Sequence, residues 1–221
     1  MVKQSVNVKD LVVRVIDVKL ANDFIKKWHY SGKVVPNSQL HFGVLLNGVL
    51  HGVMQFGPPM LKHKMIKLVA NTPWNGFIEL NRLAFDPFLP KNSESRAISV
   101  ALRIIKKKAP HIKWVVSFAD GIQCGDGTIY RATGFLLTQI KKNVGNQKID
   151  DEGNVHTRLS YTAHKPNEID AFNKMKLADG YQFRYVYFLD ETCKKDLQVE
   201  VLPYSKIKEM GASMYKGVKM R

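Results

Sequence analysis

Residues 77–135 read FIELNRLAFDPFLPKNSESRAISVALRIIKKKAPHIKWVVSFADGIQCGDGTIYRATGF, and this stretch decides the fold. The hydrophobic period is two at 77–85 and 113–120, as in strands, and close to 3.6 at 97–108, as in a helix. KNSESR (91–96) is a polar turn before that helix, and a short helix follows the second strand. This order predicts a βαβ crossover, a unit that binds ligands at the carboxyl ends of its strands.

Length and composition predict one domain with an appendage. With 221 residues and 45% hydrophobic content the chain can bury one core, which we place at residues 1–192, with a basic tail at 193–221. The sequence contains no apolar run long enough to span a bilayer and no signal-peptide pattern at MVKQSVNVKD. We therefore expect a soluble, cytoplasmic protein without membrane contact. The two cysteines, Cys124 and Cys193, are too few for a disulfide framework.

The charge favours a polyanionic partner. The chain has 34 Lys+Arg against 19 Asp+Glu, a formal net charge of +15. Basic residues cluster at 62–67, at 103–113 and in the last thirty positions, and such clusters neutralise phosphates. The alternative is that the lysines only keep the protein soluble. Trp74 lies beside the first cluster and could stack on a base, although tryptophans are more often part of the core.

The segments before residue 77 predict a strand at 11–18, a helix at 20–28 and a hairpin. Asn22 is a candidate cap of the helix, which stops at WHYSG (28–32). There His29 either caps carbonyl groups or acts as a general base or ligand at the mouth of a site. Asn47-Gly48 favours a two-residue turn between strands at 39–46 and 49–56. After residue 135 we expect further strands at 135–141, 155–162 and 181–189.

Polar residues on the two central strands are candidates for the site. If Ile78, Leu80 and Leu83 face the core, Glu79 and Asn81 lie on the opposite face, and a kink would decide the side of Arg82.

The second strand carries Ser117 and ends at Asp120, and a carboxylate at the tip of a buried strand is more often functional than a random surface carboxylate. Tyr130, on the short helix, is either core or a proton donor.

The turn KNSESR precedes a helix whose first N–H groups suit a phosphate. The alternative is an ordinary helix cap.

The order of elements resembles the GCN5-related N-acetyltransferase (GNAT) fold, a mixed and mostly antiparallel α/β sheet flanked by helices. In that fold acyl-CoA sits in a V between two central strands, which here would be 77–85 and 113–120. The superfamily's phosphate loop is glycine-rich, whereas this one reads NSESRAIS (92–99). The resemblance implies acetyl-CoA or a related acyl donor, with its phosphates bound by Asn92, Ser93, Ser95 and Arg96.

More narrowly, WHYSG (28–32), FGVLLNGVLHGVMQFGPP (42–59), ELNRLAF (79–85), NSESRAIS (92–99), SFAD (117–120) and GTIYRATGF (127–135) together resemble the phage Mom family. The resemblance implies an enzyme that converts adenine in double-stranded DNA to N6-carbamoylmethyladenine, which protects phage DNA from restriction in an infected or lysogenic bacterial host. It implies His29, Tyr30, Asp120 and Tyr130 as active-site residues, and we add Ser117 as a candidate.

Iron is associated with that family, and His29, Tyr30 and Asp120 are plausible ligands for it, although no compact metal spacing occurs in the sequence. Two other functions stay open. One is an ordinary GNAT-type acetyltransferase that acts on a protein, a tRNA or a small amine. The other is a DNA-binding protein without enzymatic activity.

Overall fold

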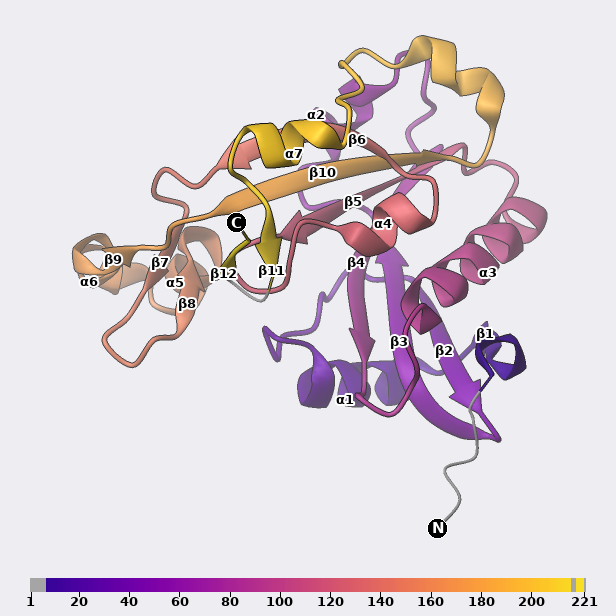
Figure 1. The fold of residues 1–221 in the computed structure, drawn as a ribbon, viewed down its shortest axis with the longest axis horizontal. Coiled ribbons are helices and arrows are strands. Elements are labelled where there is room, and N and C mark those ends of the chain that lie inside the picture. Colours follow the sequence, from indigo (N-terminus) through magenta and orange to yellow (C-terminus); the bar gives the residue numbers. More distant parts are fainter. Residues whose placement is uncertain (1–6, 216–217, 221) are drawn as a thin grey trace. The chain divides into compact units, whose positions relative to one another are not determined.

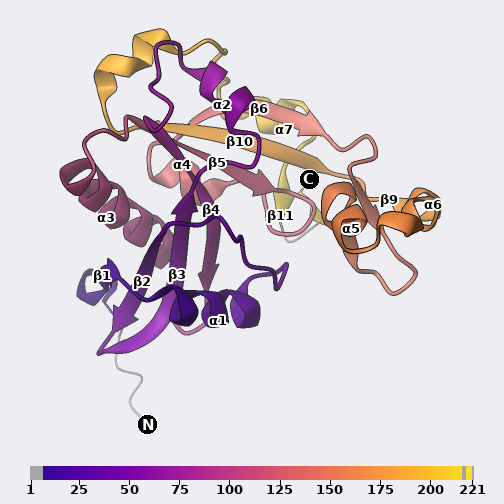
Figure 2. The same ribbon diagram turned by 180° about the vertical axis from the view of Figure 1, so that it is seen from behind.

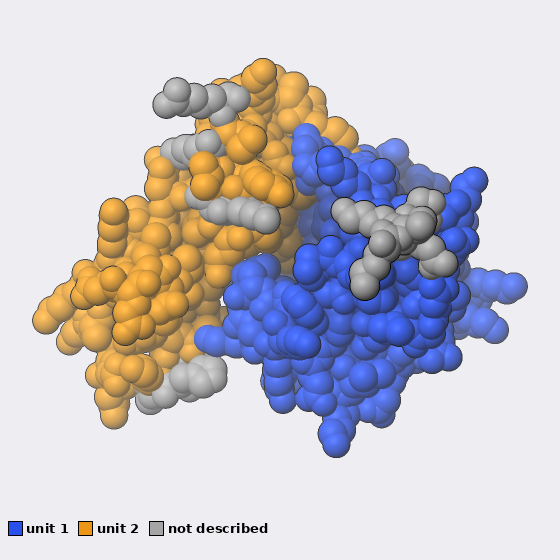
Figure 3. Space-filling model, turned by 60° about the horizontal axis from the view of Figure 1, so that its bottom comes forward, with its two compact units in different colours: residues 1–117, 128–138, 185–201 blue, residues 118–127, 139–184, 202–221 orange. Residues whose placement is uncertain are grey.

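The computed structural model describes residues 7–215 and 218–220, and the chain divides into two compact units (Figure 3). Unit 1 comprises residues 1–117, 128–138 and 185–201, and unit 2 comprises residues 118–127, 139–184 and 202–221. The start of the basic tail at residue 193 stays a prediction. Residues 193–201 fall in unit 1, and those after them in unit 2.

The largest sheet has seven strands, and all of them have residues in unit 1 (Figure 1). Consecutive pairs from β1 to β4 are antiparallel, whereas β4 and β5 are parallel. The predicted fold class, a mixed and mostly antiparallel α/β sheet flanked by helices, is therefore confirmed. The order is β1 (Val12–Val15), β2 (Leu40–Leu46), β3 (Val49–Gly57), β4 (Phe77–Phe85), β5 (Trp114–Asp120), β10 (Tyr181–Phe188) and β6 (Leu136–Lys142).

The hairpin β2–β3 forms as predicted. Asn47 and Gly48 adopt φ angles of 51° and 80°, the left-handed conformations that a tight hairpin turn of matching twist requires.

Helix α1 (Val18–Trp28) packs on strands β2, β3 and β4, and Figure 2 shows it in front of them. Its apolar stripe buries Ala21 and Ile25 against Val53 of β3 and Ala84 of β4. The predicted cap was wrong. Asp17 caps the helix by accepting a hydrogen bond from the Lys19 N–H, so Asn22 lies inside the helix, where its side chain accepts a hydrogen bond from Gln55.

Helix α3 (Ser93–Lys108) begins earlier than the sequence pattern indicates. We predicted a turn at 91–96, but Ser93 to Arg96 form the first helical turn. Asn92 adopts a φ of 71°, which ends the loop, and the buried Ser93 hydroxyl donates to the Pro90 carbonyl at 2.7 Å. The remaining helices of unit 1 are short: η1 (Val8–Asp10), α2 (Lys62–Met65), η2 (Ile66–Leu68), α4 (Thr128–Ala132) and η4 (Glu191–Asp196).

A buried tryptophan of unit 1 packs against β4 and binds the loop that precedes this strand. Trp114 is fully buried and stacks on Phe77 with ring centroids 4.3 Å apart. Its indole N–H donates to the Thr72 hydroxyl at 3.0 Å, and that hydroxyl donates to the Val69 carbonyl at 2.7 Å. One threonine therefore joins the core to the loop of residues 69–76.

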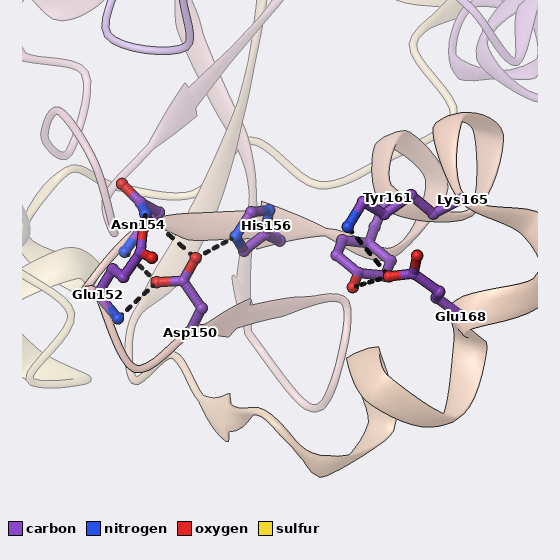
Figure 4. A network of polar contacts seen from close by, with 7 residues as sticks. All are labelled: Asp150, Glu152, Asn154, His156, Tyr161, Lys165 and Glu168. Atoms are coloured by element: carbon purple, nitrogen blue, oxygen red, sulfur yellow. Dashed lines mark hydrogen bonds and ion pairs between the residues drawn. The ribbon is translucent and has the colours of Figure 1, made fainter.

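Unit 2 contains a three-stranded sheet, short helices and a hairpin. The strand predicted at 155–162 ends at Thr157, because the Thr157 side chain caps a helix that starts at the next residue. Polar networks centred on Asp150 and on Tyr161 and Glu168 hold the loop and the helices (Figure 4). The elements are β7 (Gln147–Ile149), β8 (Val155–Thr157), α5 (Arg158–His164), η3 (Pro166–Glu168), α6 (Ile169–Lys174), β9 (Lys176–Leu177), α7 (Ser205–Glu209), β11 (Met214–Tyr215) and β12 (Val218–Lys219).

None of the helices in the described part of the chain combines the length and the apolar character needed to cross a bilayer.

Replacing Thr72 with valine should lower the free energy of unfolding by about 1–3 kcal/mol, because it leaves the buried Trp114 N–H without its acceptor. Thr162→Val is the control, since the hydroxyl of Thr162 donates to the Arg158 carbonyl near the surface. Urea titrations of both variants measure the difference, and equal stabilities would contradict the role of Thr72.

Candidate active site

The candidate site begins where β4 and β5 part. The two strands pair only at residues 77–79 and 114–116. One residue further along, the Ser117 hydroxyl donates to the Leu80 carbonyl at 3.4 Å, and Ser117 is fully buried. The pairing of the two central strands therefore stops after three residue pairs, and Ser117 is the first residue of β5 beyond it.

A β-bulge turns the polar residues of β4 to one face. Leu80 pairs with Phe56 and Arg82 with Gln55, so Asn81 is the extra residue. Since side chains alternate along a strand, the insertion places Arg82 on the same face as Glu79. The kink that we considered for Arg82 is therefore present.

Gly57, opposite Glu79, allows a close approach of the neighbouring loop. A Cβ atom on Gly57 would lie 2.6 Å from the Asn37 carbonyl oxygen and 2.9 Å from Oδ1 of Asn81. That Oδ1 accepts a hydrogen bond from the Ser38 hydroxyl at 3.1 Å. The loop of residues 33–38 is thus held against the bulge.

The WHYSG segment forms a tight turn after α1. The Gly32 N–H donates to the His29 carbonyl at 2.8 Å, with Gly32 at a φ of 58°. The Ser31 N–H donates to Nδ1 of His29 at 3.2 Å, so the neutral ring carries its proton on Nε2. The Tyr30 ring lies 4.1 Å from the His29 ring, and Tyr30 is half exposed. The rings of His29 and Tyr30 therefore lie against each other, and their active-site roles stay a prediction.

Arg82 joins the turn to the strand. Its Nε donates to the Lys33 carbonyl at 2.9 Å, and its Nη1 donates to the Asn81 carbonyl at 2.8 Å. Burial lowers the pKa of Arg82, and the nearby Tyr30 and Glu79 oppose that shift. The guanidinium is thus a fixed positive charge in the site.

Burial and this charge set the protonation of the site. Burial, with the Arg82 charge as the second cause, lowers the pKa of His29 to about 3, which leaves a neutral imidazole that is a weak base. Burial raises the pKa of Glu79 to about 7, although the hydrogen bond with Asn81 and the Arg82 charge act in the opposite direction. Glu79 therefore exchanges its proton near neutral pH, as suits a general base.

Asp120 ends β5 and Tyr130 lies on α4. Tyr130 is buried on α4, with its ring centroid 5.3 Å from that of Phe135 and 5.2 Å from that of Tyr185. Asp120 belongs to unit 2, whereas His29, Tyr30, Ser117 and Tyr130 belong to unit 1.

Three amide N–H donors hold the Asp120 carboxylate. The backbone N–H of Ile122 donates to it at 3.0 Å, the Gln123 side chain at 3.1 Å and the Gln147 side chain at 2.7 Å.

The candidate phosphate-binding residues lie at the start of α3. The Ser95 hydroxyl donates to the Asn92 carbonyl at 3.1 Å, Arg96 is exposed, and the Ser93 hydroxyl is directed to Pro90 as described above. These bonds satisfy the hydroxyls within the chain. The phosphate-binding role of Asn92, Ser93, Ser95 and Arg96 stays a prediction.

The structure does not support the iron site that the resemblance implies. Among residues 7–215 and 218–220 there is no group of three or more His, Cys, Asp or Glu side chains that could hold a metal ion.

Glu79 and Arg82 were not among our candidate catalytic residues. The sequence signal that could have identified Glu79 is the alternation in FIELNRLAF, which places Glu79 away from the core. Its raised pKa comes from burial, which the pattern of one strand does not reveal.

The whole chain resembles known proteins. The model of the Mom protein family matches residues 10–206. The methylcarbamoylase Mom of Escherichia phage Mu is 33% identical over 208 residues, which cover 90% of this chain and 85% of that protein.

Solved structures of acetyltransferases also show similarity. The ribosomal-protein-S18-alanine N-acetyltransferase of Escherichia coli matches with a TM-score of 0.47 and 9% identity over 81% of this chain and 94% of that one. An acetyltransferase of Bacillus subtilis in complex with CoA matches with a TM-score of 0.47 and 11% identity over 80% of this chain and 98% of that one.

Glu79→Gln should stabilise the protein at alkaline pH. Because folding raises the pKa of Glu79 from 4.5 to about 7, stability falls as the pH rises through this interval, and glutamine removes the loss. We expect a gain of about 3 kcal/mol at pH 8 and little change at pH 4. Thermal unfolding at both pH values measures it. The exposed Glu191→Gln is the control, and an equal response of the two variants would contradict the shift.

Proposed function

The chain belongs to the Mom protein family, and we propose that it is a transferase that converts adenine in double-stranded phage DNA to N6-carbamoylmethyladenine. The observation that carries this proposal is its 33% identity, over 90% of the chain, to a methylcarbamoylase. The net charge of +15 suits a DNA substrate. The modification would protect the phage DNA from host restriction.

Adenine N6 needs a base and a fixed position. Its lone pair is delocalised into the ring, so the enzyme must remove a proton and hold the electrophile close. Glu79 fits the role of proton acceptor because its pKa lies near 7. His29, which we also considered as a base, is too weakly basic at a pKa of about 3. With its proton on Nε2, it fits the role of a hydrogen-bond donor instead.

The target base must leave the duplex to reach these groups. The half-exposed Tyr30, whose ring lies against His29, offers an aromatic wall for it. Arg82 beside it would stabilise negative charge that develops during transfer.

The donor we propose is acetyl-CoA or a related acyl donor. The parting of β4 and β5 provides strand edges with which a pantetheine chain could form hydrogen bonds, as Ser117 does with Leu80. Attack of N6 on the carbonyl carbon of a glycyl thioester would release the thiol and form a glycyl amide. That amide must then rearrange to its isomer, because the carbamoylmethyl group is joined to N6 through a methylene carbon. Asn92, Ser93, Ser95 and Arg96 are the candidates for its phosphates. Asp120 and Tyr130 stay proposed active-site residues.

Expression of the chain in bacteria should yield N6-carbamoylmethyldeoxyadenosine in DNA, measured by mass spectrometry of nucleosides. Glu79→Gln should lower its yield by about 100-fold or more, the usual size of a general-base contribution. Glu191→Gln should leave the yield unchanged. Unmodified adenine in cells with folded wild-type protein would contradict the proposal, as would acetylation of a protein, tRNA or amine alone.

The rate of transfer should rise with pH through an apparent pKa near 7 and then level off, because Glu79 must be ionised to accept a proton. A pH–rate profile under single-turnover conditions measures it. The residual activity of Glu79→Gln should not show this rise with pH. If the rate of this variant still rises through a pKa near 7, a group other than Glu79 is the base.

A further inference from the structure

Trp74 is a tryptophan on the surface of unit 1, with 58% of its area exposed. Nζ of Lys62 lies 4.7 Å from its ring centroid and donates to the neighbouring Asn75 side chain at 3.1 Å. A cation thus lies near the ring, and more than half of the residue's surface is open to water. This arrangement plays no part in the chemistry proposed above.

The loop that carries Trp74 is fixed at both ends. At its start, Thr72 is bound to Trp114 and to Val69. At its end, the Lys113 N–H donates to the Gly76 carbonyl at 2.7 Å, and the Gly76 N–H donates to the Pro73 carbonyl at 2.7 Å. A partner that meets this tryptophan therefore does not have to order the loop first, which lowers the entropic cost of binding.

The surrounding sequence carries only positive charge. No Asp or Glu occurs between Asp23 and Glu79, whereas Lys62, Lys64 and Lys67 lie on the two helical turns just before the loop. Charge complementarity therefore selects a polyanion. An aromatic face beside several cations is the combination that binds an unstacked base together with its phosphates.

We propose that Trp74 and Lys62 form a stacking platform for an unpaired nucleobase of the DNA, with Lys64 and Lys67 contacting the adjacent phosphates. The choice of DNA as ligand rests on the proposed function. The Trp74 ring supplies a π-face that every base can use, so the platform holds the strand without reading its sequence. It is an additional nucleic-acid contact besides the residues that act on N6.

Unit 2 provides a matched control. There Nζ of Lys165 lies 5.6 Å from the Tyr161 ring, but Glu168 accepts hydrogen bonds from both side chains (Figure 4). This Lys–aromatic pair is neutralised by a carboxylate, so it should not attract a polyanion.

The test is the anisotropy of a fluorescein-labelled, mixed-sequence single-stranded oligodeoxynucleotide, measured at several salt concentrations with the full chain and no donor. Trp74→Ala should weaken binding about tenfold without changing the salt dependence, because a stacked base is lost but no phosphate contact. Trp74→Phe should restore most of the affinity. Lys64→Ala, which removes a proposed phosphate contact, should reduce the salt slope by about one ion. Tyr161→Ala should bind as the wild type does.

Unchanged affinity in Trp74→Ala would overturn the platform, as would equal losses in Trp74→Ala and Tyr161→Ala. The platform would also be overturned if binding to vesicles of anionic lipid depended on Trp74 while binding to the oligonucleotide did not. The binding assay is independent of catalysis. If binding depends on Trp74 but adenine stays unmodified in cells, the proposed function is overturned and the platform stands. If adenine is modified in cells and Trp74→Ala binds the oligonucleotide as tightly as the wild type, the proposed function stands and the platform is overturned.

Discussion

The end of the parallel pairing between β4 and β5 is the constraint on which the candidate site depends. The two strands share hydrogen bonds at three residue pairs only, and then their main-chain groups must find other partners. The Ser117 hydroxyl serves one of them, the Leu80 carbonyl. The next residue of β4, Asn81, is the bulge, which turns Arg82 to the face of Glu79. The gap between the strands and the polar face of β4 thus arise within a few residues of each other.

A partly buried arginine then sets the protonation of this face. A guanidinium removed from water needs hydrogen bonds, and the Lys33 and Asn81 carbonyls provide them. Its charge helps to keep His29 neutral and lowers the raised pKa of Glu79, so that Glu79 titrates near neutral pH. An Arg82→Lys change would not be conservative, because lysine lacks the planar fork that reaches both carbonyls.

Local patterns in the sequence predicted much of the fold. The period of FIELNRLAF gave the bounds of β4 as observed, and Asn47-Gly48 identified the hairpin. The start of α3 was missed because it depends on a left-handed Asn92 and on the bond from Ser93 to Pro90, which polar residue types alone do not specify. The site was predicted in part. His29 and Tyr30 are adjacent in the sequence, whereas the environment of Glu79 depends on a bulge and on a distant loop.

The two acidic side chains that are candidates for the chemistry have different surroundings, and this difference argues for different roles. The Asp120 carboxylate accepts hydrogen bonds from three amide N–H donors. Few of its lone pairs therefore remain for a substrate proton. Such a carboxylate suits a fixed acceptor that orients a polar group. Glu79 is buried beside a cation and changes its protonation near pH 7, which a proton acceptor must do in each catalytic cycle. We therefore propose proton transfer as the role of Glu79 on β4, and orientation of a polar group as the role of Asp120.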